Sequence, residues 1–161
     1  MSEQKIEDFW ELVESVSICM VSTVDGDVIR SRPMAPYIDR EAGLIRFMTD
    51  RTSAKVEELN EEHMMALSFA DQSSMKFASL SGVATVTTDR GLVDDMWGPY
   101  AETFFPGDKD TADVAIITVR PVQGEYWDND TSIFKMGWEV TKAYLTDDTP
   151  DLGPNGKVAL Q

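Results

Sequence analysis

The sequence predicts a mainly β (α+β) protein, built as one closed or half-closed antiparallel barrel with short flanking helices. Runs of β-branched and apolar residues recur at short spacing from residue 17 onward, and turn signals such as Asp25-Gly26-Asp27 separate them. The helical patterns between these runs are brief. A parallel doubly wound sheet needs a long crossover helix between successive strands, and the spacing leaves no room for one. No glycine-rich loop of the Rossmann or Walker type is present.

The N-terminal half begins with a predicted amphipathic helix at residues 3–16. Apolar residues recur there every three or four positions, and acidic residues occupy the opposite face. Asp-Gly is a strong signal for a two-residue hairpin turn, so the first two strands should pair. The strands of this half are expected at 17–24, 28–35 and 44–49, followed by a short helix at 53–62.

The C-terminal half is predicted to be mostly strand. Gly82 should mark a bulge or a close approach of backbones, and Pro121 should separate two strands. A short helix is expected at 91–97 and an irregular segment at 100–113. The strands are expected at 64–70, 77–88, 114–120, 124–127 and 142–145. One domain over residues 1–147 and a loosely held, turn-rich tail over 148–161 complete the prediction.

Composition and charge exclude several classes of protein. The 161 residues include 14 Lys and Arg against 29 Asp and Glu, for a net charge of −15, which argues against a nucleic-acid or anionic-membrane binder. The single Cys19 and single His63 exclude a Cys/His zinc site, and we predict no metal site. Cys19 is expected to be a buried, inert thiol, and His63 to end the helix at 53–62. No apolar run approaches the ~18 residues of a membrane span, and the amphipathic start is not a signal peptide, so we expect a cytoplasmic protein.

One window reverses the overall charge. Residues 28–55 contain six basic and three acidic side chains, so the window carries +3 while the remainder carries −18. Either these cations gather to bind a small anion, or they are charges at strand edges and turns that point to solvent. The basic residues are Arg30, Arg32, Arg40, Arg46, Arg51 and Lys55.

The order of elements in this window favours a phosphate site. A strand ends at Thr49, a polar turn follows, and a helix is predicted to begin near Ser53. Unpaired N–H groups at a helix start attract phosphate; Ser53 adds a hydroxyl, Lys55 an ammonium, and Arg32 on the neighbouring strand a planar guanidinium. The alternative is that Ser53 is only a helix cap and Lys55 a solvated charge.

Four motifs in order give the sequence a family resemblance. They are Arg-Ser-Arg-Pro-Met at 30–34, Phe-Met-Thr-Asp-Arg-Thr-Ser-Ala-Lys at 47–55, Phe-Phe-Pro-Gly at 104–107 and Gly-Glu-Tyr-Trp-Asp at 124–128. Together they resemble the split-barrel flavin-binding proteins, and more narrowly the general stress protein 26 branch of the pyridoxamine 5′-phosphate oxidase-like superfamily. The resemblance extends from the first helix to about Leu145.

This resemblance implies a six-stranded antiparallel split β-barrel and a homodimer with two FMN sites at the subunit interface. It implies that Trp127 reaches the flavin from the partner subunit; the alternative is a core or interface aromatic. The other cofactor-binding residues that it implies are Arg32, Pro33 and Met34 along the flavin, Met48 and Thr49 at the ribityl and phosphate side, and Ser53 and Lys55 at the phosphate.

The function implied is that of an FMN-dependent oxidoreductase of unknown substrate, with NAD(P)H or another small molecule as reductant and no catalytic acid or base assigned. Two alternatives stay open: a non-catalytic flavin reservoir or redox sensor, and a split barrel without flavin that is an interaction module or binds another phosphorylated ligand.

Departures from the oxidases bear on the substrate. Tyr37 stands where true pyridoxamine phosphate oxidases carry a lysine, and the stretch after Trp127 has no arginine or histidine but includes Asp128 and Asp130. We therefore expect weak or no oxidation of pyridoxamine 5′-phosphate.

Overall fold

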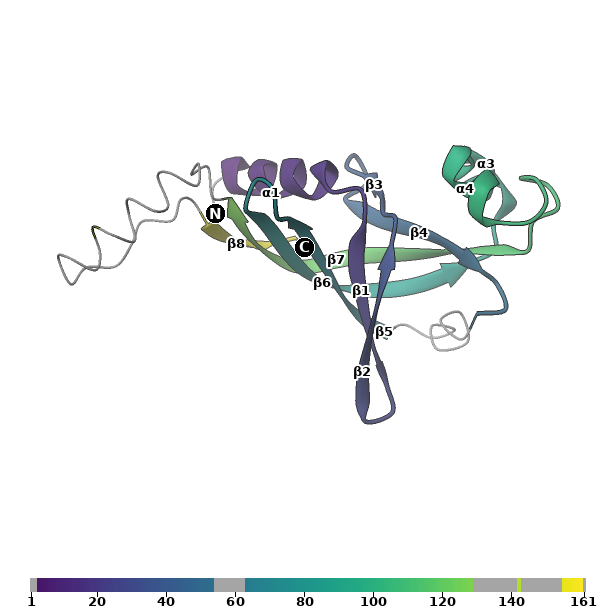
Figure 1. Ribbon diagram of the computed structural model, residues 1–161, viewed down its shortest axis with the longest axis horizontal. Helices are drawn as coiled ribbons and strands as arrows, with labels where there is room; N and C mark the ends of the chain where they lie inside the picture. Colours follow the sequence, from purple (N-terminus) through teal and green to yellow (C-terminus); the bar gives the residue numbers. More distant parts are fainter. Residues whose placement is uncertain (1–2, 54–62, 129–141, 143–154, 161) are drawn as a thin grey trace.

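A computed structural model describes residues 3–53, 63–128, 142 and 155–160, and its strands form one antiparallel sheet (Figure 1). The strand order is β2-β1-β5-β6-β7-β4-β3, and β8 pairs with β7 beside this path. The helices are α1 (Glu3–Ser15), α3 (Arg90–Met96) and α4 (Pro99–Phe104). The strands are β1 (Cys19–Asp25), β2 (Val28–Met34), β3 (Tyr37–Asp39), β4 (Leu44–Asp50), β5 (His63–Asp71), β6 (Lys76–Thr87), β7 (Val114–Asp128) and β8 (Asn155–Ala159).

The predicted mainly β, antiparallel fold is confirmed, and α1, α3 and most strands lie within a few residues of their predicted ranges. The β1–β2 hairpin closes between Asp25 and Val28 through a two-residue loop. Gly26 in that loop has a φ of 59°, a conformation that side chains with a Cβ rarely adopt. Apart from Ser53, the predicted helix at 53–62 lies outside the described residues.

The prediction that Pro121 separates two strands was wrong, because β7 is continuous over 15 residues. The register of β6 and β7 shifts between Ser81 and Gly82, so β7 accommodates the proline at a bulge instead of ending there. The predicted role of Gly82 is confirmed: a Cβ there would lie 2.6 Å from Cγ1 of Val119 and 2.7 Å from the carbonyl oxygen of Arg120.

Two further predictions need correction. Among the described residues, the short strands β3 and β8 add to the six longer strands of the sheet. β8 falls in the predicted tail and pairs with β7, so the end of that tail belongs to the sheet. His63 begins β5 and does not end a helix. The predicted strand at 142–145 lies outside the described residues except for Lys142, which is helical.

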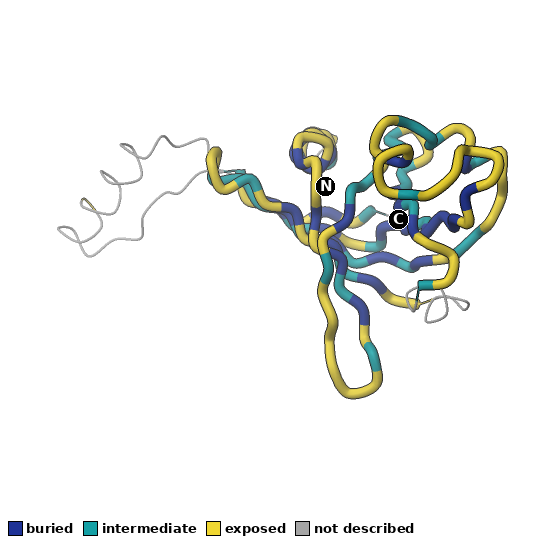
Figure 2. The backbone as a smooth tube through the Cα atoms, turned by 45° about the vertical axis from the view of Figure 1, so that its right-hand side comes forward, coloured by how far each residue is buried: buried dark blue, intermediate teal, exposed yellow. Residues whose placement is uncertain are grey.

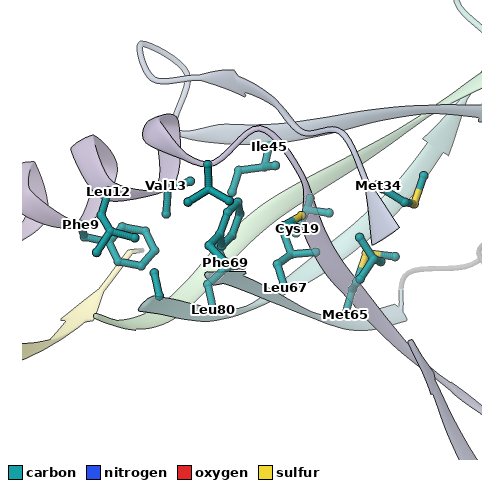
Figure 3. Packing of buried hydrophobic residues seen from close by; sticks show 14 of the residues in the cluster. Phe9, Leu12, Val13, Cys19, Met34, Ile45, Met65, Leu67, Phe69 and Leu80 are labelled. Carbon is teal, nitrogen blue, oxygen red and sulfur yellow. The ribbon is translucent and has the colours of Figure 1, made fainter. Parts of the chain in front are cut away.

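The main core lies between α1 and the sheet. Phe9 and Val13 of α1 are fully buried against strand residues that include Phe69 and Leu80 (Figure 3). A Cβ on Gly124 would lie 2.6 Å from the Phe9 ring, so the absence of a side chain there lets α1 approach β7 closely. The helix covers one end of the long β6–β7 ribbon (Figure 1).

A second, smaller core fixes the helices α3 and α4 at the other end of that ribbon (Figure 1). Val93 of α3 packs with Val114 and Ile116 of β7, and Met48 of β4 joins this cluster. The Asp89 side chain caps α3 by accepting a hydrogen bond of 2.9 Å from the Leu92 amide. The cluster also includes Trp97 and Phe105, the residues on either side of the segment that contains α4.

No helix in the described ranges is both long enough and apolar enough to cross a membrane.

Candidate functional site

A cavity of about 270 Å³ lies where the ends of β2 and β4 meet α4. Five of the predicted cofactor-binding residues line it together: Pro33, Met34, Met48, Thr49 and Ser53. The remaining lining residues are Ala35, Asp50, Tyr100, Phe104 and Phe105. We call this space the site cavity.

The polar end of the site cavity is the turn that follows β4. Thr49 is 4% exposed, and its hydroxyl oxygen lies 3.4 Å from that of Ser53. The Ser53 amide donates to the Asp50 carbonyl at 3.1 Å, which fixes the turn. Thus two hydroxyl groups face one another at this end.

Asp50 brings a negative charge to the same turn. Its carboxylate accepts hydrogen bonds from the hydroxyl of Thr52 at 2.6 Å and from the amide of Thr52 at 2.7 Å. These two bonds, the hydroxyl first, hold the pKa of Asp50 below its usual range. The carboxylate is therefore ionised at neutral pH and occupied by the turn itself.

Arg32 is not among the described lining residues. The Arg32 guanidinium donates to the hydroxyl of Thr23, a residue that is 5% exposed, and Arg32 immediately precedes Pro33 of the site cavity. Lys55 lies outside the described residues.

Most other cations of the basic window pair with carboxylates of the chain itself. Arg30 pairs with Asp25 at 3.1 Å, and Arg46 with Asp39 at 2.5 Å. The Arg46 side chain is the main reason that the pKa of Asp39 is lowered. The other pairs are Arg40 with Glu7 and Glu14, and Arg51 with Asp113. These four arginines therefore stabilise the fold or face solvent, as the alternative interpretation of the window held.

Trp127 lies far from the site cavity of its own chain. It follows Ala115, the β7 partner of Thr49, by 12 residues, which is about 40 Å along an extended strand. Its side chain is 37% exposed and pairs in register with Phe77. A single chain does not bring Trp127 to the predicted flavin site.

Sequence reasoning missed the aromatic wall contributed by α4. Tyr100 and Phe104 are 46% and 62% exposed, and their ring centroids are 4.5 Å apart. The signal was present: Pro99 is favoured at the first turn of a helix, and residues four apart share a helix face. The segment was predicted to be irregular because its following Pro-Gly dipeptide is typical of a turn.

On β1, β5 and β6, one side of the sheet lacks charged residues in its central part, and no described element covers it there. Along β1, β5 and β6, alternate residues point away from the core, and none of them on the central part of these strands is charged. We call this surface the outer face; its residues are Met20, Ser22, Met64, Ala66, Ser68, Ser79, Ser81 and Val83.

The outer face continues onto the protruding β1–β2 hairpin. Val24 and Ile29 are paired there and are 68% and 75% exposed. Figure 2 shows the hairpin extending from the sheet with an exposed tip. Single exposed apolar residues are ordinary, but a continuous uncharged surface is typical of an interaction site.

Among the described residues, no group of three or more His, Cys, Asp or Glu side chains is arranged to hold a metal ion. Cys19 is 1% exposed, and burial raises the pKa of its thiol to about 12, so the predicted inert thiol is confirmed.

Comparisons with known proteins agree with this architecture. The sequence model of the family described as pyridoxamine 5′-phosphate oxidase like matches residues 4–151. The chain is similar to a crystal structure assigned to general stress protein 26 from Jannaschia sp. CCS1, with a TM-score of 0.79 and 27% identity, covering 98% of this chain and 99% of that chain. The split-barrel fold predicted from the resemblance is therefore confirmed.

Two further relatives carry informative names. The general stress FMN/FAD binding protein of Xanthomonas citri has a TM-score of 0.72 and 26% identity, covering 82% of this chain and 94% of that chain. Protein bli-3 of Neurospora crassa is 26% identical in an alignment of 155 positions that covers 89% of this chain and 74% of that protein.

Proposed function

This chain belongs to the pyridoxamine 5′-phosphate oxidase-like family, and we propose that it is a homodimeric FMN-binding protein of the general stress protein type. The observation that carries the proposal is the site cavity, in which five residues predicted for FMN lie together. The name of the Xanthomonas citri relative, an FMN/FAD binding protein, supports a flavin as the ligand.

The two ends of the site cavity match the two ends of FMN. The hydroxyls of Thr49 and Ser53 supply hydrogen bonds that suit a phosphate. Met34 and Met48 supply polarisable, apolar contacts that suit a flat ring system. The Asp50 carboxylate accepts both hydrogen bonds of Thr52 through one oxygen, Oδ1, which holds it against the turn.

The described residues of one chain enclose too little space for the cofactor. Ligand cavities usually hold about 300–1,000 Å³ and cover most of the ligand, whereas the site cavity holds about 270 Å³. A second copy seated on the outer face would supply the missing wall. The uncharged composition of that face and the distance of Trp127 from its own site cavity both support this arrangement.

When bound, the flavin would supply hydride or single-electron transfer. The residues of the chain hold and shield it: Thr49 and Ser53 bind the phosphate, Met34 and Met48 orient the ring, and Phe104 excludes water from one side. No described residue stands out as a general acid or base, so we propose an oxidoreductase whose chemistry is the cofactor's. A flavin reservoir or redox sensor uses the same residues, and steady-state turnover with NAD(P)H and a quinone separates the two functions.

The proposal is tested by titrating the purified protein with FMN, following flavin fluorescence, and measuring its size in solution. A dimer that binds one FMN per chain is expected. A monomer, or a protein that leaves the fluorescence of FMN unchanged, would refute the proposal.

A mixing experiment tests whether each site uses both subunits. Ser53→Asp places a negative charge at the phosphate, and Trp127→Ala removes the partner's ring, so each variant alone should bind FMN poorly. After unfolding and refolding together in equal amounts, half of the dimers carry one intact site, and about a quarter of all sites should recover. No recovery would show that Trp127 does not serve the opposite site.

A further inference from the structure

A second cavity of about 180 Å³ adjoins the site cavity. The two share Ala35, Met48 and Tyr100 as lining residues, so a molecule in one lies against the wall of the other. Tyr37, at the start of β3, and Gly98, before α4, line only this second space. We call it the side cavity.

The side cavity is lined by apolar and aromatic groups. Among its lining residues in the described part of the chain, none is charged, and the polar side-chain atoms are the hydroxyls of Tyr37 and Tyr100. Met96 and Ala101 supply apolar surface from α3 and α4. A neutral ring that carries one or two hydrogen-bonding groups matches this lining.

The volume of the side cavity indicates the size of ligand that fits it. An engineered cavity of about 150 Å³ in another protein accommodates benzene. At about 180 Å³, the side cavity has room for one six-membered ring with a small substituent.

The charges of the protein disfavour binding of an anion in the side cavity. An anion against this lining would lose part of its hydration without meeting a cation among the described lining residues, a cost that is smaller for a neutral molecule. The net charge of −15 adds a repulsion on approach.

We propose that the side cavity binds a neutral, single-ring aromatic or quinone-like compound, and that this compound is the substrate placed beside the flavin. The role as substrate rests on the proposed function, whereas binding of the ring depends only on the side cavity.

The test uses benzamide and benzoate, which share a shape and differ in charge. Each is titrated into the full-length protein, with and without FMN, and amide chemical shifts of Tyr100 and Ala101 are followed by NMR. Benzamide should bind at least about tenfold more tightly than benzoate. Equal affinities, or no binding of benzamide, would overturn the proposal.

Two variants locate the binding. A Cβ on Gly98 meets no atom within 4 Å, so Gly98→Leu places its side chain in open space beside the cavity and should weaken benzamide binding about tenfold or more. Tyr37 is 46% exposed, so Tyr37→Lys should fold; its ammonium should reverse the preference in favour of benzoate. Unchanged selectivity in Tyr37→Lys would refute the assigned location.

FMN binding distinguishes the two proposals. Neither Gly98 nor Tyr37 lines the site cavity, so both variants should keep the wild-type affinity for FMN. If FMN binds and benzamide does not, the further inference fails and the proposed function stands. If benzamide binds and FMN does not, the proposed function fails, and with it the role of the ring as substrate.

Discussion

The two faces of the sheet differ in how far their apolar residues are buried. On the inner face, residues such as Val21, Phe47 and Leu67 are fully buried beneath α1 and the curl of the sheet. On the outer face, Met20 and Met64 are 41% and 58% exposed, and no described element covers them. The inner face is closed by the chain itself, whereas the outer face has the composition of a surface that a second copy would close.

This difference separates what stabilises the fold from what assembles the site. Loss of an inner-face side chain should unfold each subunit, because the core is close-packed. Loss of an outer-face side chain should leave the subunit folded and change association. The variants below test that division.

The largest effect is expected from Phe9→Ala. Phe9 is fully buried, packs against Gly124 and makes an edge-to-face contact with Trp10, with ring centroids 5.6 Å apart. Removing its ring should lower the free energy of unfolding by about 3–5 kcal/mol, measured by denaturant titration. Met64→Ala, on the exposed outer face, is the matched control and should change subunit stability by less than about 1 kcal/mol. Equal losses in both variants would contradict the division between the faces.

A charge on the outer face should separate the subunits. Ala66 is flanked in register by Ser22 of β1 and Ser81 of β6, so Ala66→Glu puts a carboxylate at the centre of this face in both copies. Burying these charges against a partner should weaken association by several kcal/mol, roughly 2–5, measured by analytical ultracentrifugation.

Gln4→Glu is the control for the added charge. Gln4 is exposed on α1 and bonds to Asp8, so this variant carries the same net charge as Ala66→Glu away from the outer face. It should remain a dimer. Dissociation in both variants would assign the effect to net charge; dissociation in neither would place the subunit contact elsewhere.

Loss of a single cation near the proposed phosphate site should have a smaller effect than the charge placed on the outer face. Arg32→Ala and Lys55→Ala should each weaken FMN binding by about 1–3 kcal/mol, the scale of a charge-assisted hydrogen bond. Arg30→Ala is the control, because Arg30 lies two residues from Arg32 on the same side of β2 but pairs with Asp25. If Arg30→Ala and Arg32→Ala weaken FMN binding equally, the effect is one of long-range charge. If all three variants keep the wild-type affinity, the FMN phosphate binds elsewhere.

The fold was largely predictable because its signals are local. Alternation and the Asp-Gly turn predicted the β1–β2 hairpin, and the bulge at Gly82 was expected from a glycine within a strand. The same reasoning divided β7 at Pro121, because a proline cannot donate to a sheet, whereas the pairing with β6 continues past Pro121 by skipping one residue of β7, Val122.

The site was predictable only in part. The cluster of Met48, Thr49 and Ser53 is local in sequence, and the structure joins it to Pro33 and Met34 of β2. The aromatic wall of α4 was missed because it comes from an element distant in sequence. Likewise, the charge of residues 28–55 was counted without the carboxylates that pair with these cations. Arg40 pairs with Glu7 and Glu14, which lie outside that window on α1.

The smallest effect is expected at Cys19, on the inner face of β1. Burial raises the pKa of its thiol from 9.0 to about 12, so the folded protein keeps the proton longer than the unfolded chain as pH rises. The stability contributed by the neutral thiol is therefore fully present below pH 9 and is lost as pH rises from 9 toward 12. At pH 7 the thiol should contribute no pH-dependent difference in the free energy of unfolding relative to Cys19→Ala, which has no thiol to titrate. By pH 10 the wild type should have lost about 1–2 kcal/mol of stability relative to that variant. Two outcomes would contradict this: the free energies of unfolding of the two proteins changing in parallel from pH 7 to pH 10, or rapid reaction of native Cys19 with a thiol reagent at pH 8. Either would show that solvent reaches the inner face, so that the two faces differ less than the structure indicates.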